Sequence, residues 1–185
     1  MIFALNNKDV DIRDLKLDNI LIHENKCYLS DIGTIGPIGK IGSDSLKRIE
    51  GNVSSLPPEI ILWLLERDGD LYLDSSSQNI QNKPADMWAF GLSMLMMFGD
   101  KELDLGINAK KLTRDVIKSH LDKIKMSLAS LLKQYPNNPY LHLIERMLDE
   151  NPKTRISAVE LAAEFDKISA PLPLSLVPPA LPPRN

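Results

Sequence analysis

The sequence predicts a mainly helical fold that carries one short β-hairpin near its beginning. The chain has 185 residues, enough for one domain with a single core, and it is 43% hydrophobic and 25% charged, as globular domains are. Two short β-prone stretches separated by a polar turn lie near the start. From residue 57 onward, apolar residues recur with helical spacing. Together these features favour a helical bundle beside one hairpin.

The hairpin is predicted over residues 20–30. Residues 20–22 (I-L-I) and 27–29 (C-Y-L) form its strands, and the polar residues 23–26 form its turn. The stretch 33–52 has glycines at positions 33, 36, 39 and 42, with neither helical nor strand periodicity. It therefore predicts a long loop.

Five helical segments follow this loop, at 57–65, 85–98, 110–133, 139–148 and 157–168. The first opens with two prolines, which are favourable at a helix start. The second is apolar on nearly all sides, which is typical of a buried central helix. The third carries many lysines between its periodic apolar residues, so it predicts one or two surface helices.

The last two helices begin with recognisable capping signals. Asn138 precedes a proline at the first helical position, and Ser157 with Glu160 forms a capping box. Between the first two helices, the polar stretch 68–83 predicts an exposed insertion. Residues 169–185 are rich in proline, so they predict a disordered, extended tail rather than helix or sheet.

Composition excludes several classes of protein. The net charge of −3 argues against a protein that mainly binds nucleic acid, which needs an excess of basic residues. A single cysteine, Cys27, forms no internal disulfide and indicates a reducing compartment, so we expect a cytoplasmic protein. Cysteine and histidine show no zinc-ligand spacing, and the longest apolar run, 60–65, is too short to span a membrane.

Three polar residues flank the predicted hairpin. Asn19 precedes its first strand and Asp31 follows its second, and these two ends are neighbours in an antiparallel pair. Amide and carboxylate oxygens are ligands suited to Mg²⁺, which binds phosphates. Asp14 would lie beside such a site, where it can accept a proton from a hydroxyl group, and Lys16 can neutralise charge on a transferring phosphoryl group. The pattern predicts phosphoryl-transfer chemistry.

These residues resemble the protein kinase signature, in which a catalytic loop of the form H-R-D-L-K-x-x-N is followed by a metal motif, D-F-G. Residues 12–19 (I-R-D-L-K-L-D-N) and 31–33 (D-I-G) correspond to the two motifs. The stretches 51–59 (G-N-V-S-S-L-P-P-E), 86–91 (D-M-W-A-F-G) and 151–155 (N-P-K-T-R) resemble three further family motifs in the family's order.

The resemblance implies a kinase-like C-terminal lobe over residues 1–168, with a catalytic loop at 12–19, an activation segment at 31–59 and the tail beyond. It implies a serine/threonine kinase that transfers phosphate from Mg-ATP to a protein hydroxyl. Asp14 and Lys16 would be catalytic, and Lys16, Asn19 and Asp31 would bind ATP, with Asn19 and Asp31 also holding Mg²⁺.

Four further residues have structural roles by this resemblance. Glu59 and Arg155 would form a buried ion pair that braces the activation segment, and Asp86 would hold the backbone of the catalytic loop. Arg13 would pair with a phosphorylated residue of the activation segment, where Ser43 or Ser45 is the candidate.

The sequence also departs from the family pattern. Ile12 replaces the family histidine, Ile32 the phenylalanine, Asn52 the threonine and Ser55 the tyrosine, while Asp11 lies where an apolar residue is usual. The Asn52 substitution predicts a weaker network around the catalytic aspartate and lysine. The chain contains no glycine-rich phosphate loop, N-lobe lysine or helix C glutamate, so we expect it to be inactive or weak without a separate N-lobe or upstream segment.

Two hypotheses therefore stay open. One is a protein serine/threonine kinase acting on a protein substrate; the other is a kinase-derived pseudokinase or binding module that acts through protein contacts. The tail sequence 179–184 (P-A-L-P-P-R) has the form that proline-recognising domains bind, although we favour a solubilising, frayed terminus, because short proline motifs are common in disordered ends. No nucleic acid and no membrane are expected as partners.

Overall fold

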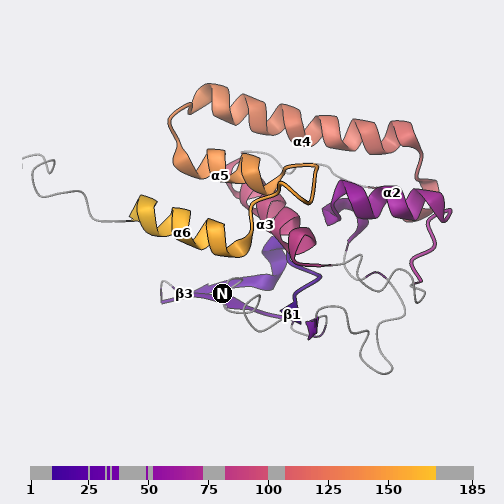
Figure 1. Ribbon diagram of the computed structural model, residues 1–185, viewed down its shortest axis with the longest axis horizontal. Helices are drawn as coiled ribbons and strands as arrows, with labels where there is room; N and C mark the ends of the chain where they lie inside the picture. The colour runs from indigo at the N-terminus through magenta and orange to yellow at the C-terminus, as the bar shows by residue number, and fades with distance from the viewer. Residues whose placement is uncertain are drawn as a thin grey trace, which may run out of the picture.

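The fold is taken from a computed structural model of the chain. It describes residues 10–24, 26–31, 33, 35–37, 49, 52–72, 82–99 and 107–169. The helices gather on one side of the molecule, with α4 running across the top, while the strands lie together on the opposite side (Figure 1). This is the mainly helical arrangement with one hairpin that the sequence predicts.

The hairpin is formed by β2 (Ile20–His23) and β3 (Lys26–Leu29). The two strands are antiparallel, and Ile20 lies opposite Leu29. The turn is tight, and Glu24 within it adopts a left-handed backbone with φ of 48°. The prediction for 20–30 is therefore confirmed, because alternating β-prone residues and a polar turn are a strong local signal.

A second antiparallel pair joins β1 (Val10–Asp11) to β4 (Gly36–Pro37). The expectation of a continuous loop over 33–52 is wrong at this point, because its early part pairs with the strand that precedes the catalytic loop. A two-residue strand carries no periodicity of its own, so the sequence gives no sign of it. Most of the remaining residues of that stretch lie outside the described part.

The five α-helices of the described part match the predicted segments within a few residues. They are α2 (Pro58–Glu66), α3 (Lys83–Phe98), α4 (Arg114–Gln134), α5 (Pro139–Met147) and α6 (Ala158–Ser169). Short 3₁₀ turns, η1 (Leu17–Asn19), η2 (Val53–Ser55) and η3 (Ala109–Lys111), lie between the longer elements. The lysine-rich segment is thus one long helix preceded by a single 3₁₀ turn.

The predicted capping signals act as caps. The Asn138 side chain accepts a hydrogen bond from the backbone N–H of Tyr140 at 3.0 Å. The Ser157 hydroxyl accepts from the N–H of Glu160 at 3.2 Å, while the Glu160 carboxylate accepts from the N–H of Ser157 at 2.8 Å. These reciprocal bonds satisfy donors that a helix start leaves unpaired, so the sequence fixes where α5 and α6 begin.

Helix α3 forms the centre of the core. Met87, Trp88 and Leu95 on this helix are buried and pack with residues of α4, α5 and α6. At Gly91, a Cβ atom would lie 2.8 Å from the Cβ of Met147 on α5, so only glycine allows the two helices to approach this closely. The prediction of a buried central helix is confirmed.

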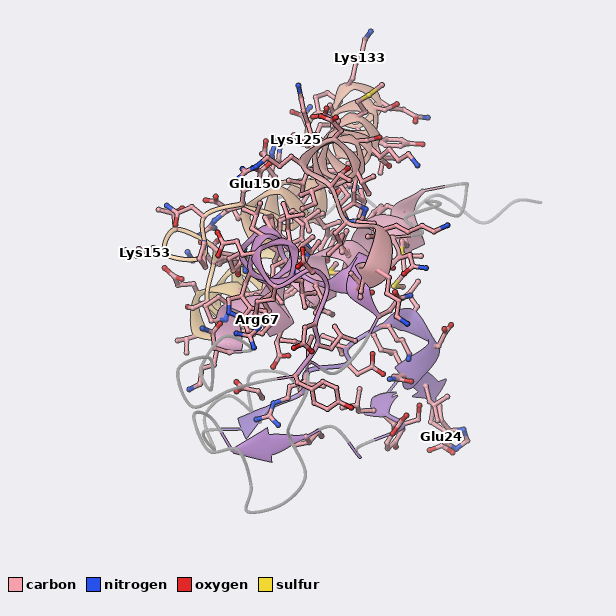
Figure 2. All side chains as sticks on the ribbon, turned by 90° about the vertical axis from the view of Figure 1, so that its right-hand side faces the viewer. Glu24, Arg67, Lys125, Lys133, Glu150 and Lys153 are labelled. Atoms are coloured by element: carbon pink, nitrogen blue, oxygen red, sulfur yellow. The ribbon has the colours of Figure 1, made fainter. Side chains whose placement is uncertain are left out.

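A second apolar cluster forms around α2. Ile60, Ile61 and Leu64 are fully buried and pack with Ile117 of α4. Charged side chains cover the outer faces, and Lys125 of α4 forms an ion pair with Glu150 beyond α5 (Figure 2). Among the described residues, no helix is long and apolar enough to cross a membrane.

Candidate active site

The predicted catalytic loop, residues 12–19, is held in place by the side chain of Asp86, on the first turn of α3. One carboxylate oxygen accepts a hydrogen bond from the N–H of Ile12 at 2.7 Å, and the other accepts from the N–H of Arg13 at 2.8 Å. The side chains of Ile12 and Leu15 are buried in the core on either side. Arg13 between them has a left-handed backbone with φ of 68°, a costly conformation that persists because its surroundings fix it.

Asp14 is the centre of a small network. Its Oδ2 accepts a hydrogen bond from Lys16 Nζ at 2.8 Å and from Asn19 Nδ2 at 3.3 Å. The same Asn19 amide donates to the main-chain oxygen of Asp14 at 2.9 Å, which ties the two ends of the loop together. The hydrogen bond to Asp14 raises the pKa of Lys16, so the lysine is firmly cationic beside the carboxylate.

Asp31 lies near this network, at the end of the hairpin, and acts on it through its charge. The N–H of Ser30 donates to the main-chain oxygen of Asn19 at 2.9 Å, so the two hairpin ends are adjacent. The Asp31 carboxylate is exposed, and its negative charge also contributes to the raised pKa of Lys16. Asp31 has a left-handed backbone with φ of 50°. The structure therefore brings Asp14, Lys16, Asn19 and Asp31 to one edge of the hairpin.

The donor set at this edge fits a magnesium ion. Asn19 turns its NH₂ group toward Asp14, so its carbonyl oxygen, which lies in the same plane, points away from Asp14. The Asp31 carboxylate is open to solvent apart from a long contact of 3.4 Å from the N–H of Gly33. One amide oxygen and one carboxylate are hard ligands that leave room for water and phosphate oxygens around Mg²⁺.

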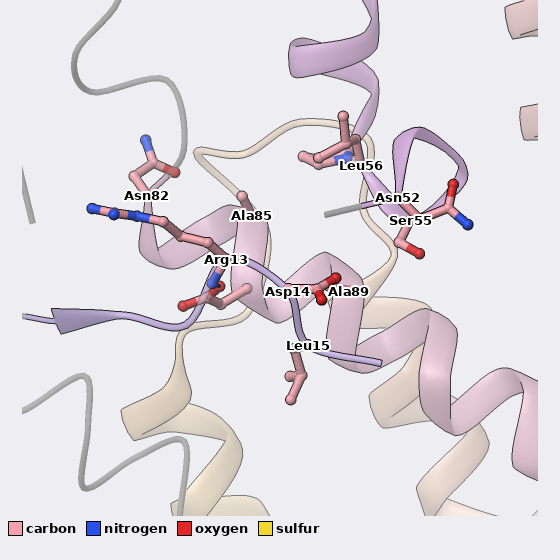
Figure 3. A pocket seen from close by; sticks show the side chains of 11 residues that line it. Arg13, Asp14, Leu15, Asn52, Ser55, Leu56, Asn82, Ala85 and Ala89 are labelled. Carbon is pink, nitrogen blue, oxygen red and sulfur yellow. Dashed lines mark hydrogen bonds between the residues drawn. The ribbon is translucent and has the colours of Figure 1, made fainter. Parts of the chain in front are cut away.

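A small pocket opens beside Asp14, between the catalytic loop, η2 and the start of α3 (Figure 3). Its free volume is about 10 Å³, room for about one water molecule. Its walls combine polar and apolar groups: Arg13, Asp14, Leu15, Asn52, Ser55, Leu56, Pro57, Asn82, Ala85, Asp86 and Ala89. Ser55, at the position of the family tyrosine, lines it and leaves more space than an aromatic ring would.

Asn52 has a local role in the structure. Its side-chain oxygen accepts a hydrogen bond from the N–H of Ser54 at 3.1 Å and so caps η2. Asn82, just before α3, lines the same pocket, and the Arg13 side chain extends toward it (Figure 3). Asn82 is not among the residues that the sequence predicts for the site. A lone asparagine before a proline-containing helix start is an ordinary capping signal, so nothing distinguishes it in the sequence.

Glu59 and Arg155 meet in the interior although they are far apart in the chain. Arg155 donates to both carboxylate oxygens of Glu59, at 2.8 and 3.0 Å. Two other N–H groups of Arg155 donate to the main-chain oxygens of Pro84 at 2.7 Å and Asp149 at 2.9 Å. The guanidinium group also lies 5.2 Å from the ring centre of Trp88. Arg155 thus joins the start of α2, the start of α3 and the loop before α6.

Some positions from the sequence analysis lie outside the described residues. They are Ile32, Ser43, Ser45 and the tail from residue 170 onward. The role expected of Arg13 toward a phosphorylated serine therefore stays a prediction. In the described part, the Arg13 backbone is bound by Asp86.

Comparison with known proteins identifies the family. The sequence pattern of the protein kinase domain matches residues 3–165. Serine/threonine-protein kinase ppk34 of Schizosaccharomyces pombe is 26% identical over 159 residues, which are 85% of this chain and 38% of that protein. The mitosis inducer protein kinase cdr1 of the same yeast is 29% identical over 153 residues, 80% of this chain and 21% of that protein. The chain spans well under half the length of these relatives.

The family match covers the hairpin, the catalytic loop and nearly all of the helical part of the chain. The helices around α3, the hairpin with the two motif ends and the bonds from Asp86 to the loop form one continuous unit. This mostly helical unit is consistent with a kinase C-terminal lobe. On this match and this fold, the chain belongs to the protein kinase family.

Proposed function

We propose that the chain is the C-terminal lobe of a serine/threonine kinase that transfers phosphate from Mg-ATP to a protein hydroxyl. The observation that carries the proposal is the Asp14 network. A carboxylate, a lysine and an asparagine are joined by hydrogen bonds of 2.8 to 3.3 Å, on a loop that Asp86 holds in place. A generic helical scaffold gives no reason for these groups to meet at one edge.

Each residue has a definite task in this proposal. Asp14 accepts the proton of the attacking hydroxyl as the bond to phosphorus forms. Lys16, already cationic beside Asp14, offsets negative charge on the transferring phosphoryl group. Asn19 and Asp31 would hold Mg²⁺, and the metal when bound neutralises phosphate charge. Asn19 also keeps Asp14 in place through its amide.

We further propose that a separate N-lobe, encoded upstream or carried by a partner, completes the nucleotide site. The chain matches 38% and 21% of its two relatives, and the motifs matched here supply one side of that site. The isolated chain should therefore bind Mg-ATP weakly. The single cysteine fits a reducing compartment, and we propose a cytoplasmic location.

Phosphoryl transfer tests the proposal. The kinase assembled with its N-lobe is purified from its native cells, and transfer of labelled phosphate from Mg-ATP to serine- and threonine-containing proteins is measured. Asp14→Asn should lower kcat by about 10²- to 10⁴-fold, because it removes the proton acceptor. Asp18→Asn is the matched control, since it removes one exposed carboxylate from the same loop. It should leave kcat within about twofold. Equal rates in wild type and Asp14→Asn would refute the assignment.

The alternative function is a binding module that has lost catalysis. Asn52 favours it, because its side-chain oxygen caps η2, whereas the family threonine at this position contacts the catalytic aspartate and lysine. Calorimetry separates the two functions. If the chain acts only through contacts, Mg-ATP binding should be undetectable even after the N-lobe is supplied, while capture of its protein partners persists. Magnesium-dependent nucleotide binding in that complex would exclude this alternative.

The tail provides a separate partner proposal. Residues 179–184 (P-A-L-P-P-R) fit the groove of a proline-recognising domain, with Arg184 pairing an acidic group there. Deleting residues 171–185 should abolish capture by such a domain and leave the melting temperature unchanged. Arg184→Ala, which keeps the prolines, should weaken capture without abolishing it. Capture that survives the deletion would contradict this role.

A further inference from the structure

A buried carboxylate beneath the catalytic loop plays no part in the proposed reaction. Asp11, the last residue of β1, has no solvent-exposed surface, and neither of its carboxylate oxygens has a hydrogen-bond partner among the described residues. An unpaired buried carboxylate is costly unless it takes up a proton. The sequence already marks the position, because the family has an apolar residue there.

Among the described residues, the charged groups that act on Asp11 come from two segments. On α3, Asp86 adds negative charge and Lys83 adds positive charge; on the catalytic loop, Arg13 adds positive charge. The opposing strand β4 (Gly36–Pro37) contributes no ionisable residue. Burial, together with the negative charge of Asp86, raises the pKa of Asp11 to about 7, although the positive charges of Arg13 and Lys83 oppose the shift.

Asp11 and Asp86 repel each other when both are ionised, so one of the two carboxyl groups tends to keep a proton. Burial also raises the pKa of Asp86, but two backbone N–H groups donate to its carboxylate and stabilise the ionised form. Asp11 receives no such donation. The proton consequently resides on Asp11, and Asp86 stays ionised to hold Ile12 and Arg13.

We propose that Asp11 is a positioning residue for the catalytic loop, a proton-controlled latch that keeps the loop ordered while neutral and loosens it when ionised. Ionised Asp11 repels Asp86 in the interior, and the relief of that repulsion favours opening of the backbone at Ile12 and Arg13. These residues directly precede Asp14, so opening displaces the proposed proton acceptor. The proposal rests on the proposed function only in naming Asp14 as the group positioned.

The expected size follows from the change in acidity. A pKa of about 7 against 3.8 in the open chain makes opening more favourable as the pH rises. If opening fully releases Asp11, the protection of the Ile12 and Arg13 amides falls about tenfold between pH 6 and 8.5. The range from pH 6 to 8.5 lies mostly above the pKa of histidines in the unfolded chain, so most of the change in protection over this range comes from Asp11.

The test is amide hydrogen exchange of the full chain by NMR, expressed as protection factors at Ile12 and Arg13. Wild type should lose about tenfold protection between pH 6 and 8.5, whereas Asp11→Asn, which is isosteric and uncharged, should change less than twofold. Asp18→Asn, an exposed carboxylate nearby, should keep the wild-type pH dependence. The same pH dependence in Asp11→Asn and wild type would overturn the proposal.

A second measurement uses the wild-type chain, so it does not depend on whether a variant folds. In the wild-type chain labelled with ¹³C at aspartate carboxyl carbons, the Asp11 resonance should titrate near pH 7. A midpoint near pH 4 would overturn the proposal. Neither measurement depends on phosphoryl transfer, so a latch that fails leaves the kinase assignment untouched, and an inactive chain leaves the latch measurable.

Discussion

The molecule contains two cation–carboxylate pairs that match in chemistry and differ in surroundings. Between the helices, Arg155 binds Glu59 with a side chain that is 0% exposed, and each of its three guanidinium nitrogens donates a hydrogen bond. At the hairpin edge, Lys16 binds Asp14 at a similar distance, but the lysine is 37% exposed and makes one such bond. The carboxylates Glu59 and Asp14 are 25% and 12% exposed, so the two pairs differ mainly at the cation, which is shielded from water in the first pair and open to water in the second.

The difference separates stability from chemistry. A pair whose cation is buried and hydrogen-bonded through all three nitrogens cannot rearrange without leaving that charge unpaired, so it holds three segments together. A half-exposed pair contributes little to stability, because water solvates either partner when the bond breaks. For that reason Lys16 can exchange its bond to Asp14 for a contact with an incoming phosphate. Three predictions test this contrast, from the largest expected effect to the smallest.

The largest effect should come from the buried pair. Arg155→Ala leaves Glu59 unpaired, and we expect it to lower the free energy of unfolding by about 3–5 kcal/mol, measured by urea denaturation. Glu59→Ala should add little in the double variant, because the shared interaction is already lost. As a control, Arg146 is 47% exposed and lies 3.4 Å from Glu164, so Arg146→Ala should cost less than about 1 kcal/mol. If the losses in free energy of unfolding from Arg155→Ala and Glu59→Ala simply added in the double variant, the two side chains would not interact, and the contrast between the two ion pairs would fail.

The second effect concerns pH. His120 is buried on α4, and neither of its ring nitrogens has a hydrogen-bond partner among the described residues. Burial, with a smaller contribution from Lys123, lowers its pKa from 6.5 to about 4. The unfolded chain therefore binds the proton first, so stability is complete above pH 6.5 and falls by about 3 kcal/mol as the pH drops to 4.

Thermal unfolding across pH 4–7 measures this loss. His120→Leu should remove the part of the acid dependence that belongs to the buried ring. His142→Leu should not, because the His142 side chain is 53% exposed. If both variants lose stability in acid as the wild type does, the buried His120 ring is not the cause of the acid dependence, and the prediction is wrong. The helical side would lose stability toward acid, whereas the Asp11 latch loosens toward base.

The smallest effect on stability should come from the exposed pair. Lys16→Met keeps the aliphatic stem and removes the charge, so the free energy of unfolding should change by less than about 1 kcal/mol. Phosphoryl transfer by the completed kinase should nevertheless fall by orders of magnitude. A stability loss as large as that of Arg155→Ala would mean that Lys16 is a structural residue, and the contrast between the two pairs would fail.

The sequence predicts the parts of this molecule that depend on local signals. The hairpin, the five helices and the Ser157–Glu160 cap follow from residue pattern alone, because period and capping act within a few residues. The meeting of Asn19 with Asp31 also follows, since a hairpin brings its own ends together.

Other features depend on contacts between distant segments, and the sequence does not reveal them. The pairing of Val10–Asp11 with Gly36–Pro37 is too short to show a period. From the sequence, Asn52 predicts a weaker network around Asp14 and Lys16. In the structure, its side-chain oxygen accepts a hydrogen bond that caps η2, because local capping competes for the same oxygen. The isolation of the Asp11 carboxylate appears only once its surroundings are folded.

The glycine at position 91 determines more than the spacing of two helices. A side chain there would collide with Met147 and Leu148, so the notch accepts only one axial alignment of α5 against α3. If α5 slid by one turn, other side chains would lie opposite Gly91, and the close packing of α5 against α3 would be lost. The alignment of α5 sets where the following loop departs, and that loop carries Arg155 to Glu59. The absence of a side chain at Gly91 thereby helps to set the position of the Arg155 guanidinium group, which lies much later in the chain.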